Sequence, residues 1–126
     1  MKLKIHGNSI RLRLNRREVA QFAVNARIEQ AFEWGIGATD RLVYGLESSP
    51  GAPDVGVRVT GGAITVILPA ALAQEWVNSD RVGVSAEVSL NPEKLLAILV
   101  EKEFRRLHGA NHDPDLYPNP LESEVR

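Results

Sequence analysis

The sequence contains no cysteine among its 126 residues. Disulfide bonds, thiolate nucleophiles and cysteine-ligated zinc or iron–sulfur sites are therefore excluded. Aromatic residues are scarce, at 6% of the chain. No run of about eighteen consecutive apolar residues occurs, so we expect no membrane-spanning helix. The alternating first residues are also unlike a secretory signal, and we expect a cytoplasmic protein.

The chain as a whole has no large excess of charge of either sign. Its formal net charge is -1, with 44% hydrophobic and 25% charged residues, as in an ordinary soluble globular protein. The length suits one hydrophobic core, so we predict a single domain over residues 1–126. Nothing in the sequence predicts a cofactor or a membrane partner.

What the chain does contain is a strongly patterned opening, MKLKIHGNSIRLRLNRREV. Apolar and polar residues alternate over 2–6 and again over 10–14, with a Gly-Asn-Ser turn between the two runs. A period of two on both sides of turn residues predicts a β-hairpin with one apolar face. This hairpin is the best-specified element of the sequence.

Helix signals occur at three further places. Asn15 and Glu18 match a capping box, which predicts a helix over 16–25. Asparagine, proline and an acid at 91–93 also resemble a helix start, and we predict a helix from there to His108. The periodicities also predict a helix over 70–78 and strands over 28–34, 42–46, 55–59, 63–68 and 81–90.

The predicted order is therefore ββαββββαβα. Runs of neighbouring strands with few helices favour an α+β fold, with a mainly antiparallel sheet of about seven strands and three helices. Closure of that sheet toward a barrel is one alternative, because it removes the open edges. No internal repeat is evident beyond the hairpin pattern. Residues 110–126 contain three prolines and four acids, which predicts an acidic, proline-rich C-terminal tail.

Cations gather at the N-terminus, where residues 1–17 contain six of them and no acid. On one face of the predicted hairpin, basic side chains would lie about 5 Å from their neighbours. Such charges repel unless an anion or acids intervene, which predicts a binding surface for an anionic ligand or an acidic protein. The alternative is a solvated face, or pairing with Glu29, Glu33 or Glu47. The candidate ligand-binding residues are Lys2, Lys4, His6, Arg11 and Arg13.

A second candidate site lies in the tail, where imidazoles and carboxylates occur within eight residues. These groups are ligands of divalent metals, but their spacing matches no established site. The candidate metal ligands are His108, His112, Asp113 and Asp115. If the tail folded over the hairpin, His6 would join them, and the protein would be a metal-binding or small hydrolase-like enzyme.

Serine-based catalysis has no support, because no serine lies in a nucleophile elbow. The favoured prediction is a small binding or accessory module without catalytic activity. A structural homodimer, joined along sheet edges, is a further alternative.

Four segments of the chain resemble a known family. They are MKLKI at the start, GNSIRLRL at 7–14, VEKEF at 100–104 and DLYPNP at 115–120. Together they resemble a family of small bacterial proteins that is known only as a domain of unknown function. The likeness covers nearly the whole chain. It implies a shared fold and no particular activity.

Overall fold

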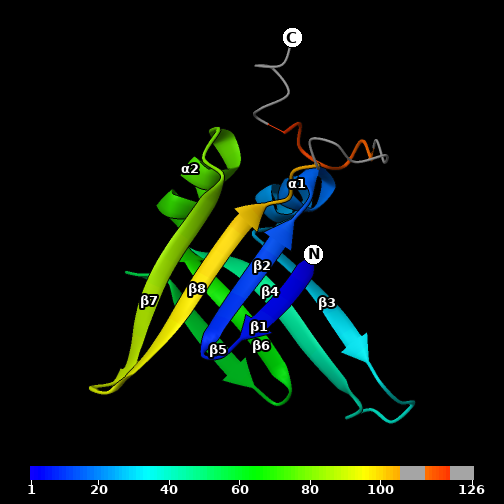
Figure 1. The fold of residues 1–126 in the computed structure, drawn as a ribbon, viewed down its shortest axis with the longest axis vertical. Coiled ribbons are helices and arrows are strands. Elements are labelled where there is room, and N and C mark those ends of the chain that lie inside the picture. The colour runs from blue at the N-terminus through cyan, green and yellow to red at the C-terminus, as the bar shows by residue number, and fades with distance from the viewer. Residues whose placement is uncertain (106–112, 120–126) are drawn as a thin grey trace.

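The computed structural model describes residues 1–105 and 113–119 (Figure 1). Within these residues, eight strands form two four-stranded sheets, and two helices lie near one end of the strands. Sheet A has the strand order β1-β2-β8-β7, and sheet B has the order β3-β4-β6-β5. No helix of this part of the chain is both long and apolar enough to cross a membrane.

The elements have the following bounds. Sheet A contains β1 (Lys2–His6), β2 (Ser9–Leu14), β7 (Gly83–Asn91) and β8 (Lys94–Lys102). Sheet B contains β3 (Arg27–Glu33), β4 (Arg41–Ser49), β5 (Gly56–Thr60) and β6 (Ala63–Pro69). The helices are α1 (Arg16–Asn25) and α2 (Ala70–Asn78).

The N-terminal hairpin and the helix after it form as the sequence predicts. β1 and β2 pair antiparallel, with Leu3 opposite Leu12, so the apolar residues share the inner face. Gly7 takes a φ of 55° in the turn, a left-handed conformation that glycine adopts without steric cost. The Glu18 N–H donates to Asn15 Oδ1 at 2.9 Å, and the Asn15 N–H donates to Glu18 Oε1 at 3.0 Å. The predicted capping box is thereby confirmed.

The prediction of a third helix is wrong, because residues 94–102 form the central strand β8. This strand pairs antiparallel with β7 and parallel with β2. The segment 91–93 starts the turn of the β7–β8 hairpin, where the Glu93 N–H donates to Asn91 Oδ1 at 2.9 Å. The LLAILV run has apolar residues at the spacing of a helix face and also at that of a strand face. Its secondary structure is therefore decided by the strands that pair with it. The predicted helix beyond Arg105 lies outside the described residues.

The α+β class is confirmed, but the finer topology differs from the prediction. The described residues contain eight strands and two helices, instead of seven strands and three helices. Each sheet is mixed, since β2–β8 and β4–β6 are parallel pairs and the other neighbours are antiparallel. The two sheets do not close into a barrel, so the alternative of closure is wrong.

The two halves of the described chain share the topology ββαββ, which is a repeat that the sequence analysis missed. β1, β2, α1, β3 and β4 correspond to β5, β6, α2, β7 and β8. The parallel pairs have the same register in both sheets: Ser9 lies opposite Ala97, and Ala63 lies opposite Val43. Positions 9 and 63 differ by 54, and so do positions 43 and 97.

The halves are interleaved, because each sheet takes one hairpin from each of them. The first hairpin of one half pairs with the second hairpin of the other half. Outward positions carry unlike side chains, for example Arg11 in β2 and Thr65 in β6. The inward positions recur, because residues 10, 12 and 14 of β2 and residues 64, 66 and 68 of β6 are all aliphatic. The repeat is therefore one of topology, register and apolar pattern, while the outward side chains of the two sheets differ.

The hydrophobic core contains residues of both sheets and both helices. Phe22 of α1 and Trp76 of α2 occupy equivalent positions and meet edge to face, with ring centroids 6.1 Å apart. Both are almost completely buried, and Trp76 Nε1 donates to the Val82 carbonyl at 3.1 Å. This aromatic contact holds the two halves together at the helical end.

Residues 113–119 of the predicted tail pack at that same end. The Tyr117 N–H donates to the Glu103 carbonyl at 2.9 Å, and the Arg105 N–H donates to the Tyr117 carbonyl at 3.0 Å. The Tyr117 ring lies 5.7 Å from that of Phe104. This part of the tail therefore extends the end of β8.

Candidate functional site

The five predicted ligand-binding residues lie on the outer face of sheet A, which points away from the core. On β2 the alternate residues Ile10, Leu12 and Leu14 are buried, so Arg11 and Arg13 point outward. The outward residues of β1 are Lys2, Lys4 and His6. No element of the described part of the chain covers this face (Figure 1).

Two rows of side chains cross this outer face from β1 to β7. In the first, Lys4 lies opposite Arg11, Arg11 opposite Leu99, and Leu99 opposite Ser85. The second row is nearer the β1–β2 turn and consists of His6, Ser9, Ala97 and Glu87. Half of each row therefore comes from the N-terminal hairpin, and the other half comes from the β7–β8 hairpin.

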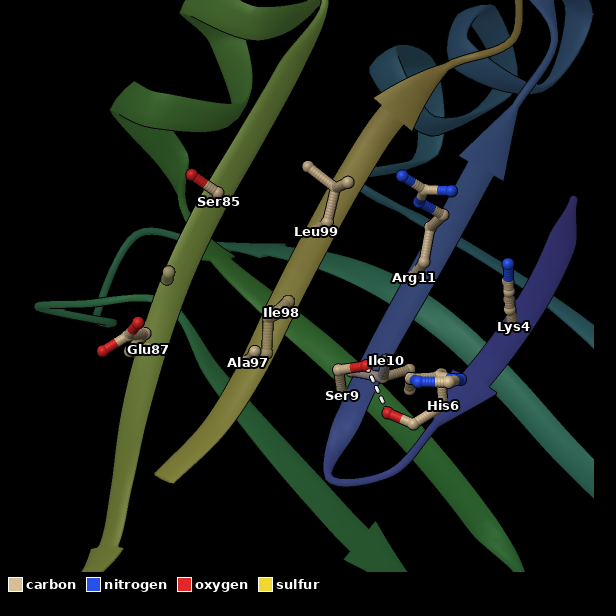
Figure 2. Close-up of a pocket in the computed structure, with 11 residues that line it drawn as sticks. Lys4, His6, Ser9, Ile10, Arg11, Ser85, Glu87, Ala97, Ile98 and Leu99 are labelled. Atoms are coloured by element: carbon tan, nitrogen blue, oxygen red, sulfur yellow. Dashed lines mark hydrogen bonds between the residues drawn. The ribbon is translucent and has the colours of Figure 1, made fainter. Parts of the chain in front are cut away.

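A hollow of about 630 Å³ lies over these two rows. Figure 2 shows Lys4 and Arg11 on one side of it and Ser85 and Glu87 on the other. Between the two sides lies β8, with the small side chain of Ala97. The volume falls within the range of roughly 300–1,000 Å³ that ligand pockets usually have.

One carboxylate forms ion pairs with two of the arginines. Glu101 Oε1 lies 3.3 Å from Arg11 Nε and 2.7 Å from Arg13 Nε. Because a single negative charge faces two guanidinium groups, this cluster keeps a net positive charge. The carboxylate also fixes how both guanidinium groups are oriented.

The other cations of the face differ in their partners. Lys2 Nζ pairs with the Glu103 carboxylate. Lys4 makes no ion pair with any acid in residues 1–105 and 113–119, and its side chain is exposed. Among the described residues, Arg11, Arg13 and Lys4 together therefore have a single paired acid, Glu101.

The acids that pair with this face are those that the sequence analysis missed. Glu101 was predicted to lie on a helix, and its place beside Arg13 depends on the parallel pairing of β2 with β8. The acids suggested instead lie on sheet B, where Arg27 contacts Glu29 and Glu47. A hydrogen bond from Arg58 lowers the pKa of the Glu47 carboxyl, so this group is also engaged.

The candidate metal ligands are described only in part, since His108 and His112 lie outside the described residues. The Asp115 carbonyl accepts from the Arg16 N–H at 2.6 Å, and its carboxylate lies 3.4 Å from Arg17 Nη2. Asp113 Oδ1 accepts from the Asp115 N–H at 2.9 Å. Both aspartates therefore lie near the start of α1.

β1 ends at His6, beside the β1–β2 turn, and this turn lies at the end of sheet A that is far from α1 (Figure 1). The structure thus does not bring His6 to Asp113 and Asp115. Among the residues it describes, no group of three metal-ligating side chains occurs. A metal site that includes His108 and His112 stays a prediction.

Comparison with known proteins identifies a family. The model of a family of unknown function (DUF7009) matches residues 1–121. No curated protein and no solved structure match the chain. The resemblance stated from the four sequence segments is therefore confirmed.

Proposed function

Because the chain belongs to this family of unknown function, we propose its function from geometry alone: it is a binding module that holds an anionic ligand on the outer face of sheet A. The observation that carries the proposal is the shared carboxylate of Glu101. Two guanidinium groups contact it, and the uncompensated Lys4 lies beside them. The Glu101 carboxylate balances only part of the positive charge of this cluster, so an anion placed there is attracted by the remainder.

The arginines retain donors for such a ligand. Arg13 uses Nε for its hydrogen bond to Glu101, and Arg11 also points Nε toward that carboxylate. The terminal nitrogens of both groups donate to no other residue of the described chain. A guanidinium group has five N–H donors, and the terminal ones are those that bind phosphate or carboxylate in a bidentate manner.

Stability alone gives little reason for this arrangement. The side chains of Arg11 and Arg13 are 38% and 40% exposed. Ion pairs at such positions contribute on the order of 0–1 kcal/mol to the free energy of unfolding. The hollow beside them favours a small ligand over an acidic protein, because it offers a concave site of ligand size.

Binding of inorganic polyphosphate and of nucleotides, measured by calorimetry over a series of salt concentrations, tests the proposal. We expect the double variant Arg11→Ala, Arg13→Ala to bind about tenfold more weakly or worse, because hydrogen bonds to charged groups contribute about 1.5–3 kcal/mol each. The affinity of the wild type should also fall with rising salt.

The matched control is Arg41→Ala, which removes an exposed arginine from the first residue of β4 in sheet B. It should leave the affinity unchanged. Equal affinity of the wild type and the double variant would overturn the proposal, and so would an equal loss in the Arg41 control. The edge-joined homodimer stays a prediction, with β1 and β7 as the outer strands of sheet A and β3 and β5 as those of sheet B.

A further inference from the structure

We infer that the ligand of this face has two unlike polar ends. An anionic group lies against Arg11 and Lys4, and a cationic or strongly hydrogen-bond-donating group, such as an amine, lies against Glu87. An uncharged middle part crosses β8 between them. This inference rests on the proposed function, since it places the anionic end in the same cationic cluster.

The spacing of the two ends follows from the strand order. Arg11 is on β2 and Glu87 is on β7, with β8 between the two strands. Neighbouring strands lie about 4.8 Å apart, and the two residues belong to different rows, which are about 7 Å apart along the strands, so their side chains start about 12 Å from each other. A single phosphate is too small to reach both.

The floor between the two ends carries no charge. Ala97 and Leu99 are the outward residues of β8 at this place, and both line the hollow. The alanine leaves room over the strand, and the half-buried leucine offers an apolar contact. The lining contains no Phe, Tyr or Trp, so nothing favours stacked bases of a nucleic acid strand.

Glu87 forms the acidic rim of the hollow. Its side chain is exposed, and within residues 1–105 and 113–119 it makes no ion pair. Ser85 lies near it on β7 and adds a hydroxyl to the same side (Figure 2). Cations on one wall and an acid on the other complement a ligand with opposite charges at its two ends.

The repeated topology supplies an internal comparison for this arrangement. In sheet B, Thr65 occupies the position equivalent to Arg11, and Ala31 occupies the position equivalent to Glu87. The equivalent face thus lacks the acidic end and the arginine, and of the two cations it keeps only one, since Arg58 occupies the position equivalent to Lys4. The charged pair is therefore a property of sheet A and not a by-product of the ββαββ fold.

The experiment uses two matched probes, an alkyl phosphonate and the same molecule with a terminal amine, with a chain that spans about 12 Å. Calorimetry on the full chain should show that the wild type binds the aminated probe about tenfold more tightly, as expected for an added charge-assisted bond. Glu87→Gln should abolish this preference and leave the affinity for the plain phosphonate unchanged. Glu93→Gln, in the turn after β7, is the control and should retain the preference.

Arg11→Ala separates this inference from the proposed function. If it weakens both probes while Glu87→Gln leaves the preference intact, the proposed function stands and the two-ended ligand is wrong. The absence of any preference in the wild type also overturns the inference. If Arg11→Ala leaves the affinity for both probes unchanged, the proposed function fails as well. Thermal unfolding of each variant shows that it is folded.

Discussion

Lys102 is a lysine at a position where the sequence pattern places an apolar residue. It is 5% exposed and lies on the inner side of β8. Its Nζ donates to the Ser79 carbonyl at 2.7 Å, and it lies 5.9 Å from the centre of the Trp76 ring and 5.6 Å from that of Tyr117. Burial lowers the pKa of Lys102 below its ordinary value of 10.5, and the charge of Asp80 opposes this only in part.

A pH dependence of stability follows from this lowered pKa. Between the pKa of folded Lys102 and 10.5, the unfolded chain binds more protons at this residue than the folded chain does. The free energy of unfolding should therefore rise with pH across that window. Lys102→Met cannot titrate, so its stability should lack this contribution to the rise. Urea unfolding at a series of pH values compares the two proteins, and identical slopes would contradict the assignment.

At the scale of the element, β8 is the part of the fold whose secondary structure can be tested most directly. A helix over these residues would bury Leu95 and leave Ile98 at the flank of its apolar face. In the strand, Ile98 is only 2% exposed, whereas Leu95 is 54% exposed. Ile98→Ala should thus lower the free energy of unfolding by about 2–5 kcal/mol, the usual cost of truncating a buried isoleucine. Leu95→Ala should change it by less than about 0.5 kcal/mol. Urea unfolding curves measure both, and the reverse order of the two losses would refute the strand.

The elements with a clear alternation could be predicted from the sequence. The β1–β2 hairpin and the capping box of α1 depend on residues close together in the chain. Only the β1–β2 part of the candidate site was predicted for the same reason. Glu101 is 88 positions from Arg13 in the sequence, so no pattern of neighbouring residues predicts their contact. The prediction for β8 was wrong because both faces of this strand are rich in apolar residues, so the sequence does not distinguish the period of a strand from that of a helix.

At the scale of the whole molecule, the two interleaved halves depend on each other. Both parallel pairs, β2–β8 and β4–β6, join a strand of the first half to a strand of the second. Peptides 1–52 and 53–126, cut in the segment between β4 and β5, should therefore each lack native β-structure. Mixing them in equal amounts should restore it, because only the pair completes both sheets. Circular dichroism and NMR spectra measure this, and a peptide that folds alone as a monomer would disprove the dependence.

The interleaving also bears on how the chain is made. β2 leaves the ribosome early, but its parallel neighbour β8 ends only at Lys102. Until β8 has been synthesised, the first hairpin is thus without its permanent neighbour, and Arg11 and Arg13 cannot contact Glu101. Contacts between distant parts of a sequence slow folding and prolong the exposure of unpaired edges. The nascent protein therefore completes sheet A only after all eight described strands have been synthesised.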